Sequence, residues 1–478
     1  MIDIEQTLKE LNEIFLGSSD FVVRKFSVAG ISMAFVLIDG LTDKNILNRD
    51  LLCPLLSAKE FAPPYADALQ QTISYSDNIG IETTSAGLST RVAQGDVALI
   101  IDKSEELFVL SLREYSHRSI AEPPTENINR GPREGFIEDM KVNTSMLRRK
   151  LRTPNLVVET IKVGRFSNTG ISVCHLHGIA DDNIVNKVKE RISKIDIDGI
   201  IDSSYVAQFL EAEAFSFFSD VAISEKPDVV AAKMLEGRLC IIVDGSPVVL
   251  TLPYVIFEDL QDGSDYYSNS WRASMVRFLR MVGAFLSILL PGTYVALESY
   301  QYKLLPLKFV ISILNAVKGI PFTPAIEMLL VVIIFEVMNQ ASIRMPRIMG
   351  VSLSIVGAIV LGETAVNAGL ISSPTVLITA LAVIGKFCIP DQEAQISLLR
   401  ILFLLISAVL GLYGILIGIV VLIGYMASLN NYGTPFLAPI APLLVPDIKD
   451  TIIKSNLKRM KKRPFSIPTN NRTRQSGK

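Results

Sequence analysis

Apolar residues are patterned in two different ways along the chain, and the change falls near residue 270. Before it, short β-branched runs such as ISMAFVLI (31–38) and ISVCHL (171–176) alternate with stretches of period 3.6 such as DNIVNKVKERISKI (182–195). After it, long apolar runs follow one another with few charges between them. The pattern predicts an α/β region of two similar subdomains, followed by a polytopic α-helical membrane domain.

The two subdomains are predicted from an internal repeat. DGLTDKNILN (39–48) reappears as HGIADDNIVN (177–186), and QGDVALIIDKS (94–104) reappears as EGRLCIIVDGS (236–246), at offsets of 138 and 142 residues. Nearly constant offsets at two separate places indicate two copies of one unit, each with a buried strand, a glycine-containing turn, an amphipathic helix and a later strand. After the second late strand, Gly245 and Pro247 predict a tight turn.

Changes in composition set the expected boundaries. We expect a first α/β subdomain over 1–120, a connector with one helix over 121–160, a second subdomain over 161–270, a membrane domain over 271–447 and a basic, disordered tail over 448–478. The arginines of the connector could bind an anion, but pairing with its glutamates is the simpler interpretation. The tail could likewise bind anionic lipid headgroups.

Charge is distributed as unevenly as hydrophobicity. Residues 281–448 contain 14 Asp, Glu, Lys and Arg, whereas the first 280 residues contain 69, and the net charge is about −11 before residue 281, zero up to residue 448 and +9 after it. This distribution excludes a soluble globular enzyme, a secreted disulfide scaffold and a nucleic-acid-binding protein. An acidic N-terminus without a signal peptide and a basic tail predict that both lie in the cytoplasm.

The apolar runs predict four to six membrane spans, some of them short or re-entrant. Trp271 and the arginines after it favour a cytoplasmic start of the first span. The longest run, 401–429, contains Gly411, Gly414 and Gly418, a small-residue pattern that favours close helix packing.

Ionisable residues within these runs are the strongest candidates for function, because a charge that faces lipid is costly. The expected intramembrane charge network comprises Glu298, Glu327, Glu336, Arg344 and Lys386. Arg344 is the expected partner of Glu336, within the chain or from a neighbouring subunit. Segment 352–368, rich in small residues, is the candidate pore lining: Val356 or Val360 would form an apolar constriction, and Glu363 would concentrate cations near its mouth. The alternative is a packed helix in which Glu363 pairs with Lys386.

Other chemistry finds no support. His175 and His177 alternate on one strand, but no further ligands stand at metal-binding spacing, and the four cysteines are scattered. Phosphate-binding loops and nucleophile elbows are missing from the sequence. We therefore predict no enzyme activity, no cofactor and no metal site.

Several motifs together resemble the A subunit of spore nutrient germinant receptors. These are, in this order, NRGPREGFIEDMKVNTSMLRRKL, SEKPDVVAAKMLEGRLCIIVDGSPVVL, DYY at 265–267, PFTPAIEMLL, IRMP, SIVGAIVLGETAVNAGLIS and YGTPFLAP, and the resemblance covers the chain from about residue 31 to residue 439. The resemblance implies a multi-pass protein of the inner spore membrane that works with B and C subunits, forms a homo-oligomer and provides a nutrient-gated cation channel. Membrane lipid is a further expected partner, and nucleic acid is not.

Two alternatives remain open at this point. One is an accessory A-like membrane protein of the dipicolinate-release system, which shares much of the motif pattern. The other is a signalling scaffold that conducts no ions. Cation flux through the reconstituted complex separates a channel from a scaffold.

Overall fold

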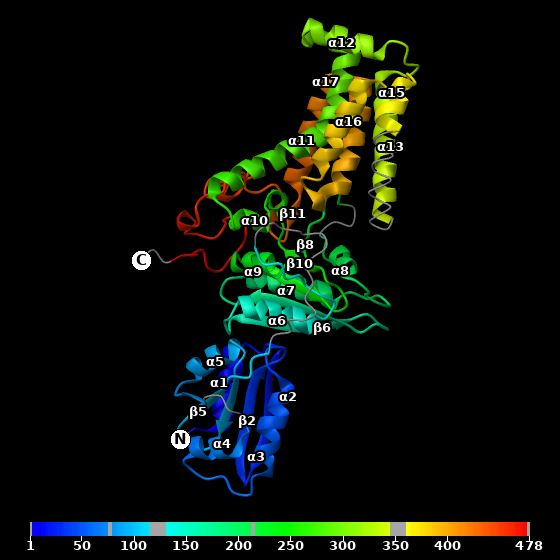
Figure 1. Ribbon diagram of the computed structural model, residues 1–478. Helices are drawn as coiled ribbons and strands as arrows, with labels where there is room; N and C mark the ends of the chain where they lie inside the picture. The colour runs from blue at the N-terminus through cyan, green and yellow to red at the C-terminus, as the bar shows by residue number, and fades with distance from the viewer. Residues whose placement is uncertain (1, 75–78, 115–130, 212–215, 345–359, 476–478) are drawn as a thin grey trace. The chain divides into compact units, whose positions relative to one another are not determined.

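The computed structural model describes residues 2–74, 79–114, 131–211, 216–344 and 360–475, and it divides into two compact units (Figure 1). Met1–Tyr254, Asn431–Thr434 and Leu457–Lys478 form the first, here called the α/β unit. Val255–Asn430 and Pro435–Asn456 form the second, here called the membrane unit. Each is described by itself below.

The first subdomain of the α/β unit is built on a five-stranded antiparallel sheet of order β1-β2-β4-β5-β3. Its strands are β1 Phe21–Val28, β2 Ile31–Ile38, β3 Gly80–Glu82, β4 Val97–Ile101 and β5 Leu107–Leu110. Its helices are α1 Ile4–Ile14, α2 Lys44–Ile46, the π-helical turn η1 Leu47–Leu52, α3 Cys53–Ser57, α4 Tyr65–Thr72 and α5 Ser85–Ala93.

The second subdomain repeats this topology with the order β6-β7-β9-β10-β8. Its strands are β6 Leu156–Val163, β7 Thr169–Leu176, β8 Ala222–Ser224, β9 Leu239–Val243 and β10 Val249–Leu252, and its helices are α6 Met140–Lys150, α7 Asp182–Ser193, α8 Ser203–Leu210 and α9 Pro227–Leu235. β2 and β7 begin 138 residues apart, and β4 and β9 begin 142 residues apart. The predicted duplication is confirmed.

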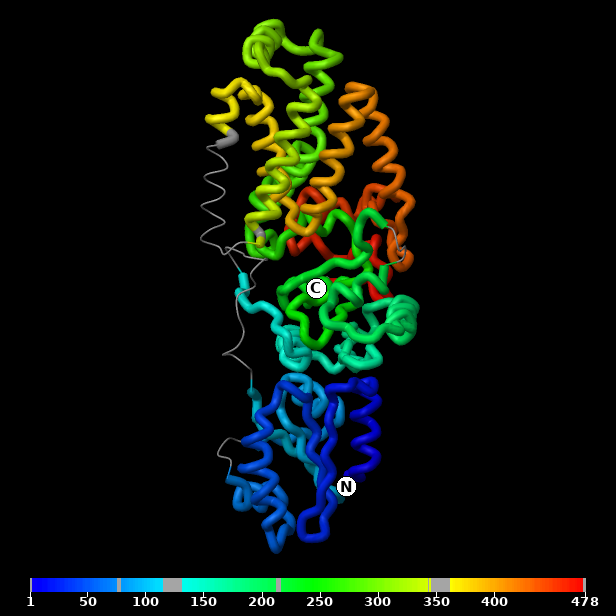
Figure 2. The backbone as a smooth tube through the Cα atoms, turned by 90° about the vertical axis from the view of Figure 1, so that its right-hand side faces the viewer, coloured from blue at the N-terminus to red at the C-terminus, as the bar shows by residue number. Residues whose placement is uncertain are grey.

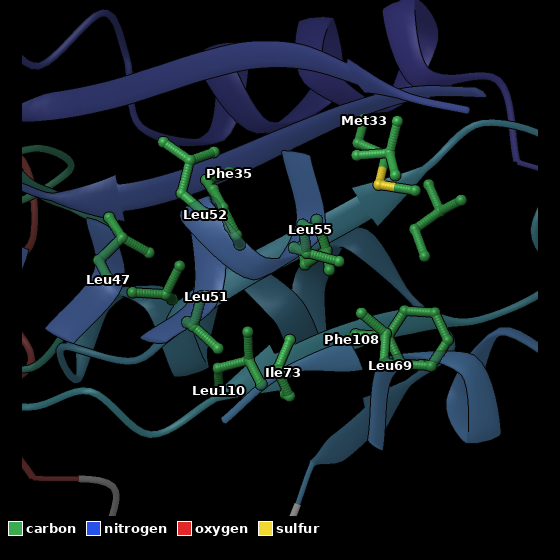
Figure 3. Packing of buried hydrophobic residues seen from close by; sticks show 14 of the residues in the cluster. Met33, Phe35, Leu47, Leu51, Leu52, Leu55, Leu69, Ile73, Phe108 and Leu110 are labelled. Carbon is green, nitrogen blue, oxygen red and sulfur yellow. The ribbon is translucent and has the colours of Figure 1, made fainter. Parts of the chain in front are cut away.

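Both faces of each sheet are buried, because successive side chains of a strand point to opposite faces. On β2, Met33, Phe35 and Leu37 pack against η1, α3 and α4 (Figure 3), whereas the residues between them pack against α1 and α5. The second sheet is covered in the same way by α7 and α8 on one face and by α6 and α9 on the other. The nearly continuous apolar sequences of the central strands are thereby explained, since a strand with one solvated face would alternate.

Two segments differ from the boundaries expected from sequence. β6 already begins at Leu156, inside the expected connector, and α6 packs on the core of the second subdomain through Met146 and Leu147. The basic tail, expected to be disordered, lies against the same subdomain: Asn470 and Thr469 donate hydrogen bonds to the backbone of Ile179, and Ile467 is fully buried. Its composition predicts solvation, but backbone contacts of this kind leave no periodic signal.

The membrane unit is a bundle of apolar helices. Its helical elements in the described residues are η2 Ile256–Leu260, α10 Gly263–Tyr266, α11 Ser270–Ser299, η3 Tyr302–Leu304, α12 Leu307–Val317, α13 Pro324–Arg344, η4 Val360–Thr364, α15 Ala365–Asn367, α16 Ser373–Lys386, η5 Pro390–Gln392 and α17 Glu393–Ser428. Three of them are long and apolar enough to cross a membrane by length and composition: Ser270–Ser299, Pro324–Ser342 and Pro390–Ser428. α11 packs closely on α16 and α17, because Gly283 and Gly385 touch each other and Gly292 touches the backbone of Phe403.

α17 is not one straight helix. Gly411 has φ 60° and ψ −146°, and a Cβ on Gly418 would meet the ring of Phe403 at 2.8 Å. In a straight helix Phe403 and Gly418 would lie about 22 Å apart along the axis. Their contact therefore shows that the chain folds back at Gly411. Figure 2 shows the two orange segments running side by side. Each half is about 27 Å long, close to the thickness of a bilayer core. The predicted long run is therefore a helical hairpin.

Replacing Gly411 with valine should prevent this reversal. The backbone conformation at Gly411 is accessible only to glycine, and a Cβ there would also meet Gln301 and Tyr300 at 3.0–3.2 Å. We expect Gly411→Val to lower the free energy of unfolding by roughly 2–3 kcal/mol, measured by thermal denaturation in detergent. Gly424→Val is the control, since a Cβ on Gly424 meets nothing within 4 Å. Equal stability of both variants would contradict the fold-back.

Candidate functional site

Four charged side chains from three helices meet at one end of the membrane unit. Glu336 comes from α13, Lys386 is the last residue of α16, and Glu393 and Arg400 lie on the first two turns of α17. Glu393 and Arg400 are seven residues apart, which places them on the same face of a helix. We call this group the four-charge cluster.

The cations of the four-charge cluster are buried between the carboxylates. Lys386 and Arg400 are both 0% exposed. The Lys386 Nζ lies 2.8 Å from Glu393 Oε1 and 3.5 Å from Glu336 Oε1, and Arg400 Nη2 lies 3.1 Å from Glu336 Oε2. Asn339 donates a hydrogen bond to Glu393, and Ser397 donates one to Glu336. Two cations thus balance two carboxylates, as an apolar environment requires.

This arrangement differs from two pairings considered from the sequence, Arg344 with Glu336 inside the chain and the alternative of Glu363 with Lys386, while a pairing of Arg344 with Glu336 of a neighbouring subunit stays a prediction. Glu336 pairs with Arg400 and Lys386, whereas Arg344 is exposed at the end of α13. Lys386 pairs with Glu393 and Glu336, whereas Glu363 is exposed on η4. Glu393 and Arg400 are not found from the sequence, because both lie before the apolar run 401–429 and not within it. Their spacing of seven residues is the signal that could have found them.

A second charged group holds the start of α11. Arg277 is fully buried and donates to Asp265 Oδ2 and Asp450 Oδ1, both at 3.0 Å, while Arg280 donates to Asp265 at 2.8 Å. Lys454 donates to the backbone oxygens of Asp265 and Ser268. These contacts tie the segment before the first membrane helix to the segment after the last one. Arg277 and Arg280, two of the arginines that follow Trp271, therefore form ion pairs inside this group.

A third group lies in the α/β unit, where Arg148 of α6 joins the two subdomains. Its side chain is 0% exposed, and its guanidinium donates to Asp20 Oδ2 at 2.8 Å and Oδ1 at 2.7 Å, and to Ser18 Oγ at 3.0 Å. The adjacent Arg149 pairs with Glu134 at 2.6 Å. Arg148 and Arg149 of the connector therefore form ion pairs with carboxylates and do not form an open anion-binding site.

The sequence of this chain is similar to those of known spore germination proteins. A family model described as Bacillus/Clostridium GerA spore germination protein matches residues 9–466. The chain belongs to this family. It is 35% identical over 481 residues to spore germination protein KA of Bacillus subtilis (strain 168), covering 99% of this chain and 87% of that protein. It is 31% identical over 474 residues to spore germination protein GerLA of Bacillus cereus, covering 98% and 96%.

Among solved structures, the N-terminal domain of the A subunit of the Bacillus megaterium spore germinant receptor GerK3 matches with 28% identity and a TM-score of 0.43, covering 53% of this chain and 96% of that one. The resemblance expected from the sequence motifs is confirmed at the level of the GerA family.

The pore candidates of this GerA-family chain lie at the edge of the described residues. Val356 falls outside them. Val360 begins η4, and only its backbone is described. Glu363 is exposed on the same π-helical turn.

Gly245, for which the sequence predicts a tight turn, has φ +88° in the turn between β9 and β10, two residues before Pro247. The hydroxyl of Ser246, between them, donates a hydrogen bond to Asp202 at 2.6 Å.

His175 gives the α/β unit of this GerA-family chain a dependence on pH. It is 5% exposed on β7, where burial, together with nearby Lys189, lowers its pKa from 6.5 to about 4. Between pH 4 and pH 6.5 the unfolded chain therefore binds a proton at His175 that the folded chain does not bind. The contribution of His175 to the free energy of unfolding is fully present above pH 6.5 and is lost as the pH falls toward 4. At pH 5 the loss should be about 2 kcal/mol.

This loss is measured by chemical denaturation at pH 7.5 and at pH 5, with unfolding followed by hydrogen exchange in β7. His175→Gln should reduce the difference between the two pH values, while His177→Gln, at an exposed position, should leave it unchanged. An equal pH response of wild type and His175→Gln would rule out this histidine as the cause.

Proposed function

We propose that this GerA-family chain is the A subunit of a spore nutrient germinant receptor. In this proposal it is a multi-pass protein of the inner spore membrane with the α/β unit in the cytoplasm. It assembles with copies of itself and with B and C subunits, and the oligomer is the nutrient-gated cation channel that starts germination. Family membership supports the receptor role, and the apolar helices of the membrane unit support its location.

The observation that carries the channel proposal is the exposure of Glu363. The carboxylates of the four-charge cluster are neutralised inside the bundle, but the side chain of Glu363 is exposed in the single chain, on a segment of mostly apolar and small residues. A carboxylate at such a place faces water or another subunit, because facing lipid is costly. A ring of Glu363 side chains in an oligomer would attract cations. η4 is a π-helical turn, a feature frequent at functional sites.

Substitutions in segment 352–368 test this proposal. Val360→Ala and Val356→Ala should widen the apolar constriction and cause spores to germinate without nutrient, at receptor levels verified by immunoblot. Val421→Ala is the control, because Val421 is 64% exposed on the second half of α17 and is not part of segment 352–368. Normal dormancy and a normal nutrient response in both valine variants would remove the segment as the pore.

Measurement of cation flux distinguishes the proposed channel from the alternative, a signalling scaffold that conducts no ions. Reconstituted complexes that contain this chain should release monovalent cations when nutrient is added, and Glu363→Gln should reduce the flux. A normal germination response in spores together with no flux through the complex would support the non-conducting scaffold instead.

A further inference from the structure

A second group of carboxylates in the membrane unit is not balanced by cations. Glu327 of α13 is 1% exposed, and Glu298, near the end of α11, is partly buried within electrostatic range of it. Neither forms an ion pair with a lysine or arginine of the described residues, in contrast to the four-charge cluster. Two ionised carboxylates close together in an apolar surrounding repel each other, so either one of them is protonated or a cation lies between them.

The neighbours of these carboxylates are oxygen atoms from three helices. Glu327 Oε1 accepts hydrogen bonds from the backbone N–H and the hydroxyl of Ser372, the N-cap of α16, both at 2.7 Å. The Ser372 hydroxyl lies 2.9 Å from that of Thr375, one turn into α16. The N-terminus of α16 and these donors offset part of the charge of Glu327, but Glu298 is left without such support.

Tyr294 provides an independent indication of a ligand. Its side chain is 7% exposed, and its hydroxyl is shielded from solvent without a hydrogen bond of acceptable geometry. The hydroxyl nevertheless lies beside Glu298 and Thr375 and within electrostatic range of Glu327. A buried hydroxyl is normally hydrogen-bonded. A buried hydroxyl beside a carboxylate and a second hydroxyl, with no hydrogen bond of acceptable geometry to either, is placed to coordinate a ligand between them.

We propose that Glu298, Glu327, Tyr294 and Thr375 bind one alkali metal cation between α11, α13 and α16. Carboxylate and hydroxyl oxygens are ligands for hard cations. A single positive charge suffices, because Ser372 and the helix N-terminus already compensate part of Glu327. This site does not depend on the channel proposal, since cation binding here requires neither an oligomer nor conduction.

Thermal denaturation of the full-length chain in lipid nanodiscs tests the site. At constant ionic strength and pH 7.5, exchanging N-methylglucamine chloride for potassium or sodium chloride should raise the midpoint by roughly 3–5 °C. Glu298→Gln removes the repulsion, so this variant should be more stable than wild type in N-methylglucamine and should no longer respond to alkali cations. Glu13→Gln, the same change at an exposed position of α1, should respond as wild type does.

Tyr294→Phe removes one oxygen ligand without changing charge, and it should lower the apparent affinity for potassium roughly tenfold while the chain still folds. Direct binding of radioactive rubidium to the wild type and to this variant measures the same quantity without denaturation. The proposal is overturned if neither variant changes the alkali response, if magnesium alone stabilises the wild type, or if only a change of pH does so.

Discussion

Replacing Arg148 with methionine should destabilise the α/β unit by roughly 3–5 kcal/mol, because it leaves Asp20 without its cation in a site that is almost closed to water. Ser18 would lose a hydrogen-bond donor at the same time. The first observable consequence should be weaker coupling of the two subdomains, seen as faster hydrogen exchange in α6 and at the start of β1 in the full-length protein.

Two comparisons make this test specific. Arg152→Met is the matched control, because Arg152 is exposed and, within the described residues, donates to a backbone oxygen of its own segment. The double variant Arg148→Met/Asp20→Leu removes both charges and should recover part of the lost stability. If Arg148→Met is as stable as Arg152→Met, the pair does not hold the subdomains together.

Replacing Lys386 with methionine should have a similarly large effect on the membrane unit. The change leaves Glu393 without its cation and Glu336 with Arg400 alone, so the four-charge cluster changes from neutral to a net charge of −1. Loss of one member of a buried ion pair costs roughly 3–5 kcal/mol. Thermal denaturation in nanodiscs and protein abundance in spores both measure the effect.

The double variant Lys386→Met/Glu393→Gln restores neutrality and should be more stable than Lys386→Met alone. Lys308→Met provides the control, since Lys308 is exposed on α12. Identical stability of the single and double variants would show that charge balance does not govern this part of the bundle.

The sequence predicts the elements of this fold better than their long-range contacts. Strands β2 and β7 are each buried over six successive positions, most of them apolar, and the turns after them contain Gly40 and Gly178 at positive φ, so both are visible as a repeated local pattern. The fold-back at Gly411 is less visible, because glycines 411, 414 and 418 fit a packed straight helix equally well. Only the conformation of Gly411 separates the two.

Charge pairing was the least predictable part of the candidate site. Glu336, Glu327 and Lys386 were recognised as buried charges because their surroundings in the chain are apolar. Their partners were not, since Arg400 is 64 residues from Glu336 in the sequence and the contact depends on how α13 packs against α17. Ion pairs within one helix can be found from spacing, whereas pairs between helices require the packing itself.

The placement of Asn431–Thr434 and of the tail within the α/β unit limits how the chain can thread the bilayer. Tyr432 donates to the backbone of Leu210, and Thr469 donates to the backbone of Ile179, so the chain is back at the second subdomain after α17 and again at its end. For a multi-pass topology, the polypeptide leaves one aqueous compartment after Tyr254 and has returned to that same compartment by Asn431. In such a topology the number of complete membrane crossings between Tyr254 and Asn431 must therefore be even. Of the four to six spans expected from the sequence, only four or six satisfy this condition.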